Sequence, residues 1–197
     1  MVTQHAFTFL APLPDDRVAP LRKLLQQLMQ DDVEDNQWFP MMKMETIHFA
    51  RLLILKEKPS ERKKAPAYPN YLVFSTNYDG SLDAHLREIV EKSGDGFQAI
   101  FGHFLDGPTE SFTTKDCVAF LKRHSDYRAY FYIGTWGRSV QQIRHEEKVR
   151  QLAEDFLDQQ ASPEESPRQI WQNMVKYLRQ QNVLLEKQAY RCYYFKI

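Results

Sequence analysis

Residues 46–55 read T-I-H-F-A-R-L-L-I-L and place two ionisable side chains, His48 and Arg51, inside an apolar run. An imidazole can exchange a proton near neutral pH, and a guanidinium can hold a carboxylate through two parallel hydrogen bonds. A strand in the interior must give each of these groups a partner or a path to solvent. The run therefore predicts either a functional site or a structural ion pair.

The next predicted strand supplies polar partners for His48. Residues 71–77, Y-L-V-F-S-T-N, are rich in aromatic and β-branched side chains. In an antiparallel hairpin with the first run, His48 lies beside Thr76 or Asn77, and Asp79 follows at the same end of the sheet. A neighbouring carboxylate orients an imidazole and stabilises its protonated form. We expect His48 and Asp79 to form a catalytic pair with Asn77 as a ligand-binding neighbour. The alternative is a structural histidine with a helix-capping aspartate.

Two arginines are candidates for binding an anionic group. Strict alternation along the strand gives Arg51 the parity of Phe49 and places it on the face opposite His48. There it meets either a ligand or a structural carboxylate that the sequence does not name. Arg138 precedes Ser139, the first residue of an S-x-x-Q capping-box pattern. An arginine at a helix N-terminus is a possible anion site, and an ordinary capped helix is the alternative.

The segment H-F-L-D-G-P, which follows Gly102, suggests redox chemistry. It resembles the G-x-x-D-G motif of dye-decolorising peroxidases, whose aspartate acts on peroxide over haem. Here Gly102 and Asp106 give G-x-x-x-D-G, which is one residue longer. Haem also requires an axial ligand, for which His103, His145 and His48 are candidates. His103 and Asp106 are therefore candidate ligand-binding residues, and a turn formed for local reasons is the alternative.

Composition excludes several classes of function. The 197 residues contain 26 Lys+Arg and 26 Asp+Glu, so no net charge favours nucleic acid or an anionic membrane. The two cysteines, Cys117 and Cys192, have no C-x-x-C spacing, so no metal site is expected. No run approaches the roughly 18 apolar residues of a membrane span, and the start lacks a signal-peptide pattern. These features predict a cytoplasmic protein.

The order of predicted elements indicates an α+β fold. Up to residue 136 the order is β-α-β-β-α-(α)-β, which is that of a ferredoxin-like β-α-β-β-α-β antiparallel sheet, followed by extra C-terminal helices. We expect the first and third strands to be parallel central neighbours. The domain expected at 1–160 is ferredoxin-like, and 161–197 is a C-terminal helix and tail packed on it. The expected strands span 5–10, 45–56, 71–77 and 127–136, and the tail at 188–197 is either a strand or a docked end.

The strand at 45–56 is apolar on both parities, whereas a half-exposed antiparallel strand alternates with polar residues. Both faces of the sheet are therefore expected to be covered, either by the C-terminal helices or by a second subunit. With a second subunit, the first two thirds of the chain resemble the dimeric α+β-barrel superfamily. That resemblance implies a homodimer with a cavity between sheet and cover, of a kind often used for small ligands or haem.

Four further motifs resemble the pattern of a bacterial family without assigned activity: T-I-H-F-A-R, F-S-T-N-Y-D-G, H-F-L-D-G-P and G-R-S-V-Q-Q-I-R-H-E. This resemblance implies no catalytic residues. We expect a small-molecule-binding protein with a cavity on its sheet, whose catalysis, if any, uses His48 and Asp79. The cofactor is unknown. The alternatives are a haem-dependent peroxidase-like oxidoreductase and a non-enzymatic protein for self-assembly or partner binding.

Overall fold

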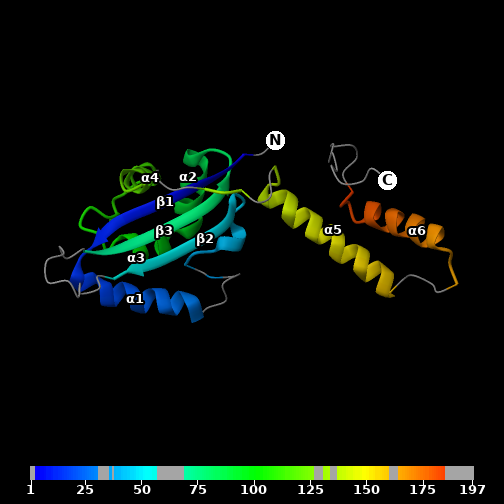
Figure 1. The fold of residues 1–197 in the computed structure, drawn as a ribbon, viewed down its shortest axis with the longest axis horizontal. Helices are drawn as coiled ribbons and strands as arrows, with labels where there is room; N and C mark the ends of the chain where they lie inside the picture. Colours follow the sequence, from blue (N-terminus) through cyan, green and yellow to red (C-terminus); the bar gives the residue numbers. More distant parts are fainter. Residues whose placement is uncertain are drawn as a thin grey trace. The chain divides into compact units, whose positions relative to one another are not determined.

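A computed structural model describes residues 3–30, 36, 38–56, 69–126, 131–133, 137–159 and 164–184. The chain divides into two compact units, residues 1–140 and 141–197. The elements in chain order are β1 (Gln4–Leu13), α1 (Asp15–Gln30), the 3₁₀ helix η1 (Met41–Lys43), β2 (Ile47–Leu55), β3 (Asn70–Asp79), α2 (Leu82–Ser93), α3 (Asp95–Phe101), α4 (Thr114–Arg123), α5 (Val140–Gln159) and α6 (Pro167–Gln180) (Figure 1).

The three strands of the first unit form one antiparallel sheet in the order β1-β3-β2. The expected neighbourhood of the first and third strands is confirmed, but their expected parallel direction is wrong. Gln4 pairs with Asp79 and Leu13 pairs with Asn70, which is an antiparallel register. The crossover through α1 makes β2 run parallel to β1, and the β2–β3 hairpin then reverses the chain. The fold is therefore α+β.

Two expected strands fall largely outside the described residues. The first is 127–136, of which only residues 131–133 are described, and these carry no regular structure. The second is the tail at 188–197. Just before the first of them, Ser125 forms an isolated antiparallel bridge with Phe9. The chain therefore reaches the edge of β1 that faces away from β3.

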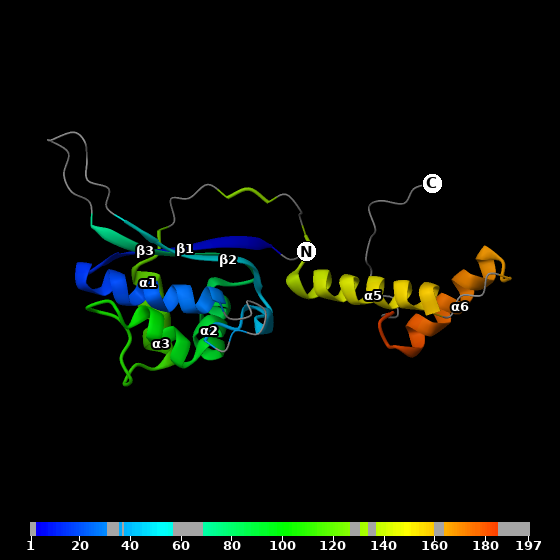
Figure 2. The same cartoon turned by 90° about the horizontal axis from the view of Figure 1, so that it is seen from below.

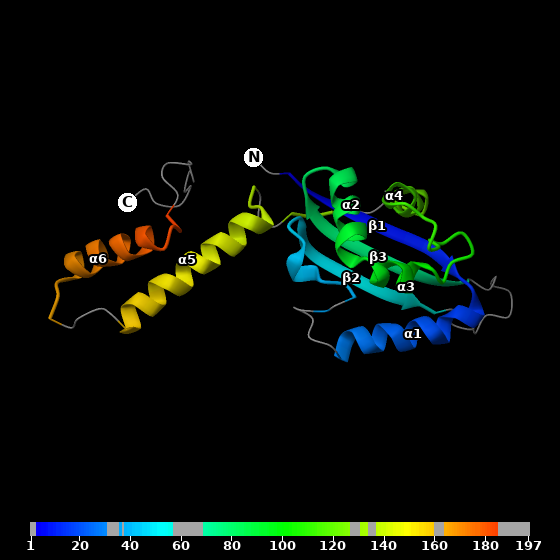
Figure 3. The ribbon, with the colours of Figure 1, turned by 180° about the vertical axis from the view of Figure 1, so that it is seen from behind.

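The core of the first unit lies between the sheet and the helices α1, α2, α3 and α4, which lie on one side of it (Figure 2). The view from behind shows α2 and α3 across the strands (Figure 3). Phe9 is fully buried, and its ring centroid lies 5.2 Å from that of Phe101 and 5.6 Å from that of Phe104. Edge-to-face aromatic pairs of this kind add to the free energy of apolar burial. Alternate strand residues supply the sheet side of the core: Phe7, Phe9, Ala11, Leu13, Leu72 and Phe74.

Local polar residues explain where two helices begin. The Thr113 hydroxyl accepts the Asp116 N–H and the Asp116 carboxylate accepts the Thr113 N–H, which forms the capping box that opens α4. Ser166 and Gln169 form the same motif at α6, with Pro167 at the first helical position. Both motifs mark where a helix starts, because the N–H groups of a first turn need partners from outside the helix.

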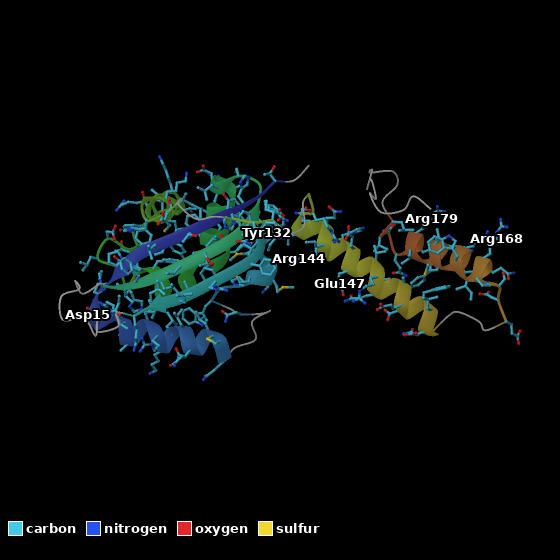
Figure 4. The ribbon with its side chains drawn as sticks, viewed as in Figure 1. Asp15, Tyr132, Arg144, Glu147, Arg168 and Arg179 are labelled. Atoms are coloured by element: carbon cyan, nitrogen blue, oxygen red, sulfur yellow. The ribbon has the colours of Figure 1, made fainter. Side chains whose placement is uncertain are left out.

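The second unit contains most of α5 and all of α6 (Figure 4). Phe156 and Tyr177 pair with ring centroids 5.5 Å apart, and Leu178 is buried. Trp171 lies two helical turns before Leu178, a spacing that indicates a shared face, but Trp171 is 61% exposed. The division between the two compact units lies at residue 140, because α5 groups with α6, and the expected domain boundary at residue 160 stays a prediction.

Candidate functional site

A β-bulge in β2 decides where its ionisable side chains lie. Ile47 pairs with Tyr78, but Phe49 pairs with Asn77, so the register shifts at His48. A bulge places two residues of one strand opposite one residue of its partner and interrupts the alternation of faces. Counting alternate residues along this strand therefore fails at His48.

His48 and Arg51 lie on the same side of the sheet because of this bulge. His48 reaches Asp79, which shares a face with Asn77 two residues before it. Arg51 pairs with Ser75, which belongs to that face as well. The prediction that His48 and Arg51 lie on opposite faces is wrong, because it assumed a regular strand.

The side of the sheet that faces away from the helices is here called the open face. Phe49 on this face is 73% exposed and Leu55 is 48% exposed, so these apolar side chains lie in solvent. The expected cover of both faces stays a prediction. The open face consists of Gln4, Ala6, Thr8, Leu10 and Pro12 on β1, Phe49, Arg51, Leu53 and Leu55 on β2, and Tyr71, Val73, Ser75, Asn77 and Asp79 on β3.

His48 and Asp79 form a buried pair at one end of this face. The His48 Nε2 atom lies 2.8 Å from Asp79 Oδ1, and the two side chains are 8% and 10% exposed. The second oxygen of Asp79 accepts the backbone N–H of Val140 at 2.8 Å. A carboxylate with a partner on each oxygen is held in one orientation and orients the imidazole in turn. The predicted pairing of His48 with Asp79 is confirmed, and its acid–base role stays a prediction.

Residues 138–140 lie at the same end of the sheet. Gln4, which pairs with Asp79, donates its side-chain amide to the carbonyl of Arg138 at 2.9 Å. Two residues later, Val140 donates its N–H to Asp79. Arg138 thus lies close in the fold to His48, although 90 residues separate them in the chain.

Asn77 and Arg51 lie on the open face, but neither contacts the His48–Asp79 pair directly. Asn77 is opposite Phe49 in the ladder, and Arg51 is two pairs further along. In the described part of the chain Arg51 forms no ion pair, and its side chain is exposed. The predicted roles of Asn77 and Arg51 in ligand binding stay predictions.

The residues of H-F-L-D-G-P lie elsewhere, in the connection from α3 to α4 on the helical side. Asp106 accepts hydrogen bonds from Arg123 at 3.0 Å and from His124 at 2.9 Å. Partial burial alone would raise the pKa of Asp106, but the His124 and Arg123 contacts outweigh it and lower the pKa. The structure does not bring His103 and Asp106 together with His48.

Sequence reasoning missed a polar network built on His85 in α2. The ring is fully buried and stacks on Tyr78 with centroids 4.0 Å apart. Its Nε2 lies 2.7 Å from the Thr76 hydroxyl and its Nδ1 lies 2.9 Å from the Thr46 hydroxyl, which donates to Glu88 at 2.6 Å. One signal was present in the sequence, because His85 precedes the core residue Ile89 by one helical turn.

The donors and acceptors of this network define its protonation. The Glu88 carboxylate only accepts, so the Thr46 hydroxyl donates to it and must accept from Nδ1–H of His85. Nε2 then accepts from the Thr76 hydroxyl, and every polar atom of the neutral ring has a partner. Desolvation by burial lowers the pKa of His85 from 6.5 to about 3. His85 is therefore a neutral structural residue and not an exchangeable proton donor.

Comparison with protein-family models, curated proteins and solved structures found no match. Within the described ranges, none of the helices combines the length and apolar character needed to cross a bilayer. Across the same residues, histidine, cysteine and carboxylate side chains form no group that could hold a metal ion.

Proposed function

We propose that the protein binds a small organic molecule on the open face of the sheet. The observation that carries this proposal is the buried His48–Asp79 pair beside the exposed apolar side chain of Phe49, with Leu55 exposed at the other end of the same strand. Small-molecule sites combine apolar surface with a few well-placed polar groups, which is the composition found here. Arg51, exposed on the same face, is suited to an anionic group of the ligand.

His48 is the residue proposed to handle a proton in this site. Its Nε2–H donates to the Asp79 carboxylate, so a neutral ring leaves Nδ1 as the atom that accepts a proton. Asp79 stabilises the imidazolium that results, and the Val140 N–H keeps the carboxylate in place. We propose that any catalysis begins with this proton transfer.

We propose that a second copy of the chain covers the bound molecule and that a fourth strand completes a ferredoxin-like sheet beside β1. The bridge between Ser125 and Phe9 supports the fourth strand. The exposed side chains of Phe49 and Leu55, at the two ends of β2, support the cover, because exposed apolar surface on this face favours contact with another surface. These side chains also favour a second candidate function, which is self-assembly without a ligand. Neither candidate uses Asp106, which accepts hydrogen bonds from Arg123 and His124, and the haem-dependent alternative stays a prediction.

Two dyes test the proposal: anionic anilinonaphthalene sulfonate and neutral Nile red. Phe49→Ala is expected to weaken the binding of both dyes, because it removes apolar contact worth about 1 kcal/mol or roughly fivefold in Kd. Arg51→Gln is expected to weaken only the anionic dye. Leu105→Ala is the control, because Leu105 is 97% exposed in the loop that follows α3.

Unchanged binding of both dyes by Phe49→Ala and Arg51→Gln would contradict the proposal, as would an equal loss in Leu105→Ala. Sedimentation velocity of the chain and of Phe49→Asp separates the two candidate functions. A dimer that binds neither dye and dissociates in Phe49→Asp favours assembly without a ligand. Saturable dye binding that depends on Phe49 favours the small-molecule site.

A further inference from the structure

A pocket of about 660 Å³ opens on the helical side of the first unit, away from the open face. The first turn of α1 contributes Arg17 to its lining, the end of α3 contributes Ala99, and the loop before α4 contributes residues 108–111. This volume lies within the range of small-molecule sites. Gly102 also lines the pocket, and most of the other lining side chains are polar or charged.

His103 lines this pocket, and its ring can report on what binds there. Its Nδ1 atom is shielded from solvent and has no hydrogen-bond partner among the residues that the structure describes. A buried polar atom without a partner costs free energy of about 1–3 kcal/mol, so such atoms are rare. Burial lowers the pKa of His103, and the charge of Arg17 lowers it further. The ring is therefore neutral at neutral pH and offers one donor and one acceptor.

The remaining polar side chains of the pocket carry both signs of charge. The Arg17 side chain is about half exposed, and its Nε lies 3.3 Å from Asp16 Oδ2. Glu110 contributes a carboxylate, and the hydroxyls of Thr109 and Ser111 lie 2.9 Å apart. The guanidinium of Arg17 matches the geometry of a ligand carboxylate. The carboxylate of Glu110 repels a ligand that carries only negative charge, but it accepts a hydrogen bond from a ligand that carries a donor.

We infer that this pocket binds a small carboxylate that also carries a hydrogen-bond donor, such as an α-hydroxy acid. The carboxylate of the ligand lies against Arg17, and its hydroxyl group meets Glu110. This arrangement pairs the ligand with both charges of the lining. The site is independent of His48 and Asp79, so it can be tested apart from the proposed function.

The test follows the His103 ring by NMR during titration with glycolate and, separately, with acetate. Glycolate is expected to shift the His103 signals saturably and to raise the pKa of His103, because a carboxylate stabilises the imidazolium. Acetate, which lacks the donor, is expected to bind at least about fivefold more weakly. Arg17→Gln is expected to weaken glycolate binding about tenfold, which is the effect of losing one charge-assisted contact.

Arg87→Gln on α2 is the matched control, because Arg87 is an exposed arginine that does not line the pocket. It is expected to bind glycolate within about twofold of the unchanged protein, as is His48→Gln. The absence of saturable shifts at His103 up to about 0.1 M glycolate would overturn the inference. Equal weakening in Arg17→Gln and Arg87→Gln would overturn it too. Equal affinity for acetate and glycolate would show that the hydroxyl group of the ligand does not contribute to binding, which would overturn the assigned ligand class.

Discussion

Lowering the pH is expected to destabilise the protein through His85. The pKa of this histidine falls from 6.5 in the unfolded chain to about 3 in the folded protein, because burial penalises the charged ring. Between these two values the unfolded chain binds a proton that the folded protein does not. The free energy of unfolding therefore falls as the pH falls from 6.5 towards 3.

The magnitude follows from the distance in pH below the unfolded pKa. At pH 5.0 the unfolded histidine lies about 1.5 pH units below its pKa, and each unit corresponds to about 1.4 kcal/mol. His85 alone thus lowers the free energy of unfolding by about 2 kcal/mol between pH 7.5 and pH 5.0. Both nitrogens of the neutral ring are already hydrogen-bonded, to Thr76 and Thr46, so these hydrogen bonds do not favour protonation at a higher pH.

Urea unfolding at pH 7.5 and pH 5.0 measures this effect in the unchanged protein and in His85→Gln. The variant is expected to be less stable at pH 7.5, because it disrupts the network, but to lose about 2 kcal/mol less on acidification. His5→Gln is the control and keeps the full dependence, because His5 is exposed. Equal pH dependence in His85→Gln and the unchanged protein, or an NMR titration that places the pKa of His85 near 6.5, would refute the reasoning.

Three further substitutions or reactions test the packing. Thr113→Ala removes the capping box with Asp116 and is expected to lower the free energy of unfolding by about 1 kcal/mol; an unchanged urea midpoint would contradict it. Gly96→Ala is expected to cost about 2 kcal/mol or more in the same assay, because a Cβ there would lie 1.9 Å from the Trp38 carbonyl oxygen; a neutral result would contradict that contact. Cys117 is buried, and desolvation raises the pKa of its thiol, so peptide mapping is expected to show maleimide labelling of Cys117 only after unfolding.

The candidate site shows which parts of the geometry follow from local sequence. The pairing of His48 with Asp79 was predictable, because two strand-like segments joined by a connection favour a hairpin, and a hairpin fixes which residues lie opposite each other. The face on which Arg51 lies was not predictable, because one extra residue at the bulge changes the alternation beyond it. A bulge has no sequence signature as strong as that of a turn.

His85 shows a different limit. A histidine in a segment of mixed polarity predicts no particular role. Its two hydrogen-bonding neighbours come from β3 and from the residue before β2, and Glu88 of α2 holds the second of them. Thr46 and Thr76 lie 39 and 9 residues from it in the chain, so only packing brings them to the ring. The same holds for Trp171, whose helical spacing indicates a buried stripe but whose exposure depends on what the helix packs against.

The sequence by itself determined the order of β1, α1, β2, β3, α2 and α4 and the capping boxes that open α4 and α6, because periodicity and capping act over a few residues. Only the tertiary structure decided the antiparallel direction of β1 and β3, the bulge at His48 and the neutral His85 network. These features depend on contacts between segments far apart in the chain, where the free energy of packing outweighs local preference. Whether His48 or His103 meets a ligand depends on such long-range placement as well.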